Sequence, residues 1–409
     1  MTSARPRRIL LRCDANPQLG IGHVARCQAL AAALYARGAE CIVVGPGREY
    51  QTSTAVREWI PHPFGGFEAK AKAEAEAEAE ADADATLADA ESLAAIAKHH
   101  QADWLVLDDY RVNEAYQRVL RKHACRWLQF DGASTQTLWA DLVLNSSPAA
   151  RAENYQKRLG NPATQLLLGP RYAILRSEFA APNCSGEAAS PNDRPAPNDQ
   201  PAPNDPASPQ RLDRAGDTPI RVYLNFGGGD DRGALRWCAQ TLLEAFPRPL
   251  HLKLVSGQQN PHNETLGLWA SRQGHQLEFL VNPPNLAVHL RACDLAILSG
   301  GMSCYEADSC GLSMLLVPLV PNQVAHARAW AEHGRAHLLE GWPDVSPSAL
   351  RAALTQCVAE WEGIQQRPQL TDGLGPRQRP QLTDGLGARQ RRQLTDGLGA
   401  QRVAELLLA

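Results

Sequence analysis

Three features that would assign this chain to a common class are missing from its 409 residues. It has no apolar run of about 18 residues or more, so no membrane-spanning helix is expected. Its formal net charge is only −3, without the basic excess that usually accompanies nucleic-acid or membrane binding. The basic N-terminus is interrupted by Arg12 and Asp14 before a signal peptide could form. We therefore expect a cytoplasmic protein with neither a nucleic-acid nor a membrane partner.

The cysteine and glycine patterns exclude two further kinds of site. None of the ten cysteines forms a CxxC pair, so the ligand spacing of a zinc site is missing. Without an export signal, these cysteines are expected to be mostly buried, reduced thiols. The complete dinucleotide pattern GxGxxG is also missing. We predict that the protein requires neither a metal nor another cofactor.

The composition is that of a globular protein, with 44% hydrophobic and 21% charged residues. Alanine and acidic residues alternate in 68–91 without an apolar face, which favours a solvated helix or a disordered insert over a buried segment. A Pro-, Asn- and Asp-rich stretch and three copies of a twelve-residue repeat are also of low complexity. The predicted units are a first domain (1–182), a linker (183–217), a second domain (218–366), the repeats (367–400) and a C-terminal helix (401–409).

Short apolar segments bounded by turn residues alternate with helical patterns in both halves. In the first half, they are residues 9–12, 41–44, 104–107, 126–130 and 142–144. In the second half, they are residues 220–225, 250–255, 277–281, 295–299 and 315–319. This alternation is typical of a doubly wound parallel sheet. The predicted fold class is α/β, with two Rossmann-like domains that face each other across a cleft.

The segment GIGH, residues 20–23, lies between the first predicted strand and the first helix. Glycines at such a position let backbone N–H groups approach an anionic ligand. A histidine at the start of the helix can act as a general base near neutral pH. From this segment alone, a surface or capping role for His23 is equally plausible. Asp108, Asp109 and Tyr110 follow a strand that is expected to end at the same edge, where Tyr110 either orients a substrate or packs in a loop.

Three segments of the second half resemble nucleotide-binding turns. NFGGGD (225–230) and SGGMSCYE (299–306) combine glycines with the start of a helix, which suits a phosphate. Glu306 is placed where a carboxylate could accept both ribose hydroxyls. Residues 321–323, PNQ, could bind phosphate or sugar oxygens, although taken alone an N-cap for the following helix is the better explanation. Asp230 and Asp231 are more easily explained as capping residues than as a metal pair.

Together, these segments resemble the UDP-2,4-diacetamido-2,4,6-trideoxy-β-L-altropyranose hydrolases of pseudaminic acid biosynthesis. The most specific match is GIGHVARC, residues 20–27. The others, in chain order, are RCD (12–14), DDY (108–110), Asp131, DLVLN (141–145), GPRYAILRSEF (169–179), FGG (226–228), DLAI (294–297), SCYE (303–306), NQ (322–323), and DGLGA (396–400) with Arg402 and Val403. The last match identifies the third repeat as the original copy.

The resemblance implies the glycosyltransferase B fold and assigns roles to residues of this chain. His23 would be the general base, and Tyr110 would help to hold water or sugar. The residues expected to bind the UDP-sugar are Gly20, Gly22, Arg26, Asp108, Gly227, Gly228, Gly301, Ser303, Glu306, Asn322 and Gln323. Met302 departs from the pattern, because the family usually has a small hydroxyl residue there.

The activity implied by the resemblance is hydrolysis of the UDP-sugar with C–O cleavage and inversion. UDP is a good leaving group, so one histidine without a partner carboxylate is expected to suffice. Two alternatives remain open at this point. One is a UDP-sugar glycosyltransferase of the same fold, and the other is a non-catalytic nucleotide-sugar-binding protein. No oligomeric partner is indicated.

Overall fold

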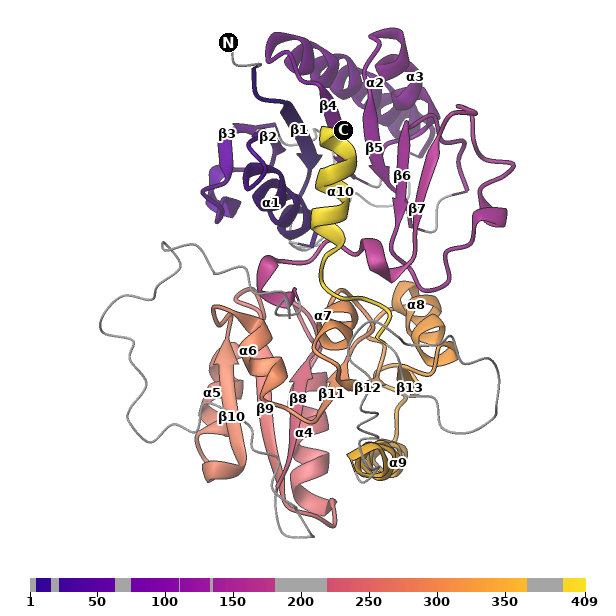
Figure 1. Cartoon of the computed structure of the whole chain (residues 1–409). Helices are drawn as coiled ribbons and strands as arrows, with labels where there is room; N and C mark the ends of the chain where they lie inside the picture. The colour runs from indigo at the N-terminus through magenta and orange to yellow at the C-terminus, as the bar shows by residue number, and fades with distance from the viewer. Residues whose placement is uncertain are drawn as a thin grey trace, which may run out of the picture.

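A computed structural model of the chain describes residues 5–15, 22–62, 75–109, 111–132, 135–180, 219–365 and 393–409. Each of its two parallel sheets forms the centre of one domain, as Figure 1 shows. The predicted fold class, two Rossmann-like α/β domains, is confirmed. Within the described part of the chain, no helix combines the length and apolarity that a membrane crossing requires.

The first sheet has seven parallel strands in the order β3-β2-β1-β4-β5-β6-β7. Its strands are β1 (Arg8–Cys13), β2 (Glu40–Gly45), β3 (Val56–Pro61), β4 (Trp104–Asp108), β5 (Trp127–Phe130), β6 (Leu142–Asn145) and β7 (Gln165–Leu168). Successive residues of a strand point to opposite faces, so Ile9 and Leu11 pack with helix α1 (Gly22–Tyr35) while Leu10 faces the other side. That other face is covered by α2 (Ala75–His99) and α3 (Glu114–Lys122).

The second sheet has six parallel strands in the order β10-β9-β8-β11-β12-β13. Its strands are β8 (Ile220–Asn225), β9 (Leu250–Ser256), β10 (Leu277–Val281), β11 (Leu295–Leu298), β12 (Ser313–Leu316) and β13 (Ala336–Leu338). One face packs against α4 (Ala234–Ala245), α5 (Asn263–Ala270) and α9 (Pro347–Gln365). The other packs against α6 (Leu286–Arg291), α7 (Ser303–Ser309) and α8 (Pro321–Glu332).

Both sheets reverse their strand order at one point, between β1 and β4 in the first and between β8 and β11 in the second. At such a switch point, the loops that leave the two central strands run in opposite directions. A crevice therefore forms at the carboxyl ends of these strands, where open α/β sheets bind ligands. This geometry directs the search for a site to the residues that follow β1, β4, β8 and β11.

The chain passes between the domains twice. After β7, Ala173, Leu175 and Phe179 pack into the core of the second domain. The last helix, α10 (Gly399–Leu408), returns to the first domain and lies beside α1 in Figure 1. Its Val403 and Leu407 belong to the same core as β1. This cover explains why α1 is buried over so much of its surface.

For residues 68–91, the helical alternative agrees with the structure, but the expectation that nothing there is buried is wrong. Helix α2 begins within this stretch, and Thr86, Asp89 and Ala90 are buried. Asp89 accepts hydrogen bonds from Arg12 Nη2 at 3.1 Å and from Tyr116 Oη at 2.8 Å. The burial of Asp89 could not be predicted from the alternation of acidic residues and alanine. Hydrogen bonds hold this carboxylate in place, and a search for apolar patterns does not detect them. The linker 183–217 and the first two repeats lie outside the described residues.

Gly397 in the third repeat is expected to tolerate no side chain. Its φ is +75°, and a Cβ atom would lie 2.1 Å from the carbonyl oxygen of Phe179. Gly38 has a similar φ of +84° but open space around it. We therefore expect Gly397→Ala to lower the free energy of unfolding by about 1–3 kcal/mol more than Gly38→Ala does. Chemical denaturation of both variants measures the difference, and equal losses would contradict the clash.

Candidate functional site between the two domains

The first half of the site is a histidine–carboxylate pair at the switch point of the first sheet. His23 lies in the first turn of α1, and Asp108 is the last residue of β4. The Nδ1 atom of His23 lies 2.6 Å from Oδ1 of Asp108. Both residues are buried, with 6% and 1% of their surfaces exposed. The expectation that the histidine acts without a partner carboxylate is therefore wrong.

Arg26, one helical turn after His23, completes a charged cluster. Its Nε and Nη2 atoms donate to the two carboxylate oxygens of Asp108 at 2.9 and 2.7 Å. Burial by itself would raise the pKa of Asp108, but the charge of Arg26 and the hydrogen bond from His23 outweigh it and lower the pKa. Asp108 is therefore ionised at neutral pH and accepts the Nδ1 proton of His23. Arg26 Nη2, which can only donate, also lies 3.1 Å from Nδ1. With the Nδ1 proton directed to Asp108, proton exchange with a ligand would fall to Nε2.

Asp108 and Arg26 were both expected to contact the substrate. In the structure, both oxygens of Asp108 accept hydrogen bonds from Arg26, and Oδ1 also pairs with His23. Contact of Asp108 or Arg26 with a ligand stays a prediction. A neighbouring cluster at the same edge joins Arg111 to Asp14 at 2.6 Å and to Asp109 at 2.5 Å. Gly22 is the first residue of α1, whereas Gly20 and Tyr110 lie outside the described residues.

The second half of the site consists of glycine turns at the carboxyl ends of β8 and β11. After β8, the N–H of Gly227 donates to the Asn225 side chain at 3.1 Å, and Gly227 has a φ of +107°. The backbone at Gly257 packs closely against this turn, because a Cβ atom on Gly257 would lie 2.1 Å from the carbonyl oxygen of Gly228. The Asn225 side chain and the neighbouring backbone at Gly257 therefore both hold this turn in place.

The second turn, after β11, contains Gly300 and Gly301 and leads into α7 with Ser303 as its first residue. Glu306 lies in that helix with 18% of its side chain exposed, 3.8 Å from Arg176. Burial raises the pKa of Glu306 to about 7, although the charge of Arg176 opposes the shift. Asn322 is exposed at the start of α8, while Gln323 Oε1 accepts the N–H of Leu319 at 2.8 Å.

Asp230 and Asp231 follow the first glycine turn and act mainly on the backbone. Asp231 accepts the N–H groups of Gly233 at 2.9 Å and Leu235 at 3.3 Å, which confirms the predicted capping role. Among the described residues, Asp230, Asp231 and His262 could offer metal ligands within 4.8 Å of one another. Asp230 accepts the N–H of Arg232 at 2.7 Å. These hydrogen bonds account for both carboxylates, and the absence of a metal requirement stays a prediction.

The two halves of the site touch each other directly. Arg26 Nη1 lies 3.9 Å from the sulfur of Met302, so the residue that departs from the family pattern contacts the charged cluster. Ser146, which follows β6, donates to the hydroxyl of Tyr305 in α7 at 3.2 Å. Neither the Asp108 pairing nor Ser146 and Tyr305 were expected from the sequence. The contacts place the first turns of α1 beside the start of α7, and the end of β6 beside Tyr305.

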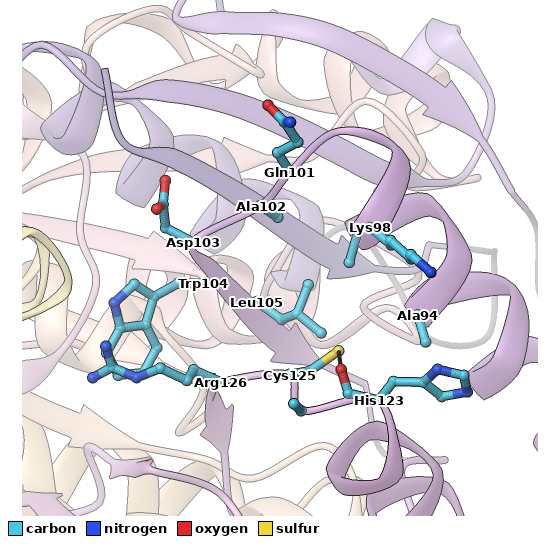
Figure 2. Close-up of a pocket in the computed structure, with 12 residues that line it drawn as sticks. Ala94, Lys98, Gln101, Ala102, Asp103, Trp104, Leu105, His123, Cys125 and Arg126 are labelled. Atoms are coloured by element: carbon cyan, nitrogen blue, oxygen red, sulfur yellow. Dashed lines mark hydrogen bonds between the residues drawn. The ribbon is translucent and has the colours of Figure 1, made fainter. Parts of the chain in front are cut away.

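A hollow of about 350 Å³ lies at the opposite end of the first sheet, where β4 and β5 begin. Figure 2 shows its lining, with Arg126 stacked on Trp104 and Lys98 pointing from α2. Asp103 is engaged by Arg5 and Arg7, and His123 by Glu91. None of the predicted site residues lines this hollow, so it is separate from the site between the domains.

Comparisons with known proteins were made against families, curated sequences and solved structures. No model of a known protein family matches the chain. The uncharacterized protein MJ1062 of Methanocaldococcus jannaschii is 20% identical over 234 residues, which cover 56% of this chain and 43% of that protein. The spore coat polysaccharide biosynthesis protein SpsG of Bacillus subtilis is 27% identical over 111 residues, or 27% of this chain and 32% of SpsG. The matches thus span less than half the length of these relatives.

Solved structures match the fold over most of the chain. MurG of Acinetobacter baumannii has a TM-score of 0.57 and 15% identity, covering 98% of this chain and 99% of MurG. The glycotransferase of kitacinnamycin has a TM-score of 0.54 and 16% identity, covering 99% of both chains. The spinosyn rhamnosyltransferase SpnG, complexed with thymidine diphosphate, has a TM-score of 0.51 and 15% identity, covering 86% of this chain and 92% of SpnG.

These comparisons correct the expected enzyme class. The sequence analysis expected a hydrolase of a glycosyl-diphosphate linkage, but the structural neighbours of this chain are glycosyltransferases. At this level of identity, the likeness establishes the architecture, and the residues of the site must carry any statement about activity. The chain has the two-domain glycosyltransferase B fold.

Proposed function

We propose that this protein is a glycosyltransferase that transfers an amino sugar from UDP to a hydroxyl-bearing acceptor. The observation that carries the proposal is the His23–Asp108 pair, whose partner Arg26 contacts Met302 beside the glycine turn after β11. A base on one side and anion-binding backbone on the other are the two requirements of sugar transfer from a nucleotide.

In the proposed reaction, His23 Nε2 accepts the proton of the acceptor hydroxyl. The acceptor oxygen then forms a bond to the anomeric carbon while the bond from that carbon to the UDP oxygen breaks. Asp108 stabilises the imidazolium that forms, because its lowered pKa keeps it ionised. Attack from the side opposite to UDP inverts the anomeric configuration.

The second domain would hold the leaving group. The N–H of Gly227 donates to Asn225, so the two turns would offer the N–H groups of Gly228 and Gly301 to the diphosphate, whose charge grows as the bond breaks. Glu306 would accept ribose hydroxyls, with Ser303 and Asn322 as further polar contacts. The neighbour SpnG was solved with thymidine diphosphate, which supports a nucleoside diphosphate as the ligand class. The resemblance described above supports a UDP-linked 2,4-diacetamido-2,4,6-trideoxy sugar as the donor to test first.

The proposal is tested by offering that donor, radiolabelled in the sugar, together with a panel of hydroxyl-bearing acceptors. We expect labelled sugar to appear on an acceptor, with little UDP released when the acceptor is omitted. Equal UDP release with and without acceptor would contradict transfer. UDP binding without any turnover would instead identify a non-catalytic binding protein.

Glu306 is expected to make nucleotide binding depend on pH. Its pKa is raised to about 7 by burial, so its carboxylate gains charge as the pH rises from 6 to 8. An ionised carboxylate accepts ribose hydroxyls more strongly than a protonated one. We expect UDP affinity to rise about tenfold across this interval, measured by titration calorimetry. Glu306→Gln, which cannot ionise, is the matched control and should remove the rise.

The raised pKa of Glu306 also makes the stability of the folded protein depend on pH. Between the ordinary pKa of 4.5 and about 7, the folded state binds a proton at Glu306 that the unfolded state has released. The contribution of Glu306 to the free energy of unfolding therefore falls as the pH rises through this window. Stronger UDP binding at higher pH would thus occur although the free protein becomes less stable, which separates the two effects experimentally.

A further inference from the structure

A chain of hydrogen bonds leads from the first domain to the glycine turn after β11. Ser146 Oγ donates to Tyr305 Oη at 3.2 Å across the domain boundary. Tyr305 Oη lies 2.9 Å from His326 Nε2, and His326 Nδ1 lies 2.6 Å from the carbonyl oxygen of Gly300. No role was assigned to these three side chains in the reaction described above.

The direction of every bond in this chain is determined by chemistry. The carbonyl of Gly300 can only accept, so Nδ1 of His326 must carry a proton. Trp330 Nε1 donates to Nε2 of the same ring at 3.3 Å, so Nε2 is an acceptor. Tyr305 therefore donates to His326 and accepts from Ser146. Burial lowers the pKa of His326, in keeping with a neutral ring. Donors that all point the same way strengthen one another.

The side chains in the middle of the chain have little freedom. Tyr305 and Trp330 are both buried. The Tyr305 ring packs on His326 at 5.3 Å and edge-on against Trp330 at 5.2 Å between ring centroids. Gly300 has a φ of +94°, and a Cβ atom there would lie 3.1 Å from Ala327 in α8. The imidazole and the turn are thus held in one arrangement by packing on both sides.

Peptide geometry transmits this arrangement to the ligand side of the turn. The carbonyl of Gly300 and the N–H of Gly301 belong to one planar trans peptide, in which they point in opposite directions. A hydrogen bond that fixes the carbonyl therefore fixes the direction of the N–H. Donation to the carbonyl also polarises the peptide and makes its N–H a better donor.

We propose that His326 and Tyr305 are positioning residues that orient the Gly300–Gly301 peptide toward the diphosphate, and that Ser146 links this orientation to contact between the domains. The inference rests on the proposed function, from which it takes the nucleotide site. Its consequence is that a residue of the first domain, remote from UDP, contributes to UDP binding through the second domain.

The first test uses the full chain, with UDP binding measured by calorimetry and no sugar or acceptor present. Asparagine at position 326 places an amide N–H near the position of Nδ1, whereas glutamine places its polar group near Nε2. We expect His326→Gln to lose about tenfold in UDP affinity, the effect of one lost hydrogen bond. His326→Asn should retain most of the affinity. Equal affinities for both variants and the wild type would overturn the positioning role.

The second test is a double-mutant cycle of Ser146→Ala and Tyr305→Phe, each of which removes one hydroxyl. If Ser146 acts through Tyr305, the double variant should bind UDP no more weakly than Tyr305→Phe alone. Additive losses would overturn the link between the domains. The ¹⁵N shifts of His326 should show a protonated Nδ1 in the wild type, which a purely structural role for Tyr305 does not require.

The two proposals fail in different ways. A wild-type protein that binds no UDP would overturn the proposed function and this inference with it. UDP binding that none of the four variants changes would overturn the hydrogen-bond chain alone. Thermal unfolding of each variant confirms that a lost affinity does not reflect a lost fold.

Discussion

Replacing His23 with alanine is expected to lower the rate of sugar transfer about 10²–10⁴-fold, the usual contribution of a general base. UDP affinity should be unchanged, because the proposed nucleotide contacts lie in the other domain. The rate is measured with saturating acceptor and the affinity by calorimetry, so that the two effects are separated. A His23→Ala variant with near-normal turnover would show that another group accepts the proton.

The matched control is a second histidine–acid pair on the same domain. His123 Nε2 lies 2.6 Å from Glu91, the same distance as in the His23 pair, but at the opposite end of the sheet. His123→Ala should leave the transfer rate unchanged. If both histidine variants slow transfer equally, the effect reflects damage to the first domain rather than loss of a base.

Asp108→Asn extends the test to the partner of the base. The amide keeps the shape of the carboxylate but not the charge that holds the Nδ1 proton and stabilises the imidazolium. The transfer rate should fall, and His23→Ala combined with Asp108→Asn should be no slower than His23→Ala alone, since the two residues act as a unit. Multiplied effects would indicate that Asp108 acts on the substrate independently of His23.

The sequence predicted the central strands of both sheets because they are buried on two faces and form continuous apolar runs. It missed β3, β7 and β13, which lie at or near sheet edges. In β3, only Val56 and Trp59 are buried, so polar residues interrupt the pattern. The strand predicted at 315–319 corresponds to β12, which spans Ser313–Leu316. The prediction extends too far because Val317 and Leu319, which follow the strand outside regular structure, are also buried. A run of apolar residues indicates that the segment is buried, but buried residues also occur outside strands, so such runs do not define strand ends.

The candidate site was predicted only where a local pattern marks it. GIGH and the glycine turns could be found because they follow strands directly. The pairing of His23 with Asp108 joins residues 85 positions apart and depends on β1 lying beside β4. That strand order is a property of the whole sheet and leaves no local signal. Tyr305 and His326 were missed for the same reason, since their partners lie on other elements.

Asp308 anchors the segment that links the third repeat to the second domain, and its loss is expected to be the most destabilising change described here. The carboxylate is completely buried and lies 2.5 Å from Nε of Arg335. Its other oxygen accepts the N–H groups of Leu394 and Thr395 at 2.7 and 2.8 Å. The Asp308→Ala substitution removes the carboxylate that accepts from Arg335 and from both N–H groups. Because the site is buried, water cannot readily replace these hydrogen bonds. We expect the free energy of unfolding to fall by about 3–5 kcal/mol.

The pair itself need not be a net source of stability. Burial raises the pKa of Asp308 even though Arg335 opposes the shift, so the fold disfavours the ionised carboxylate. What costs stability is the removal of one partner while the other remains. Asp308→Leu combined with Arg335→Met should therefore be more stable than Asp308→Ala.

Asp396→Ala, which breaks a more exposed pair with Arg402, is the control and should cost about 1 kcal/mol or less. Urea denaturation of the three variants measures these differences, and an Asp308→Ala variant as stable as the control would show that the third repeat is held by its apolar contacts alone.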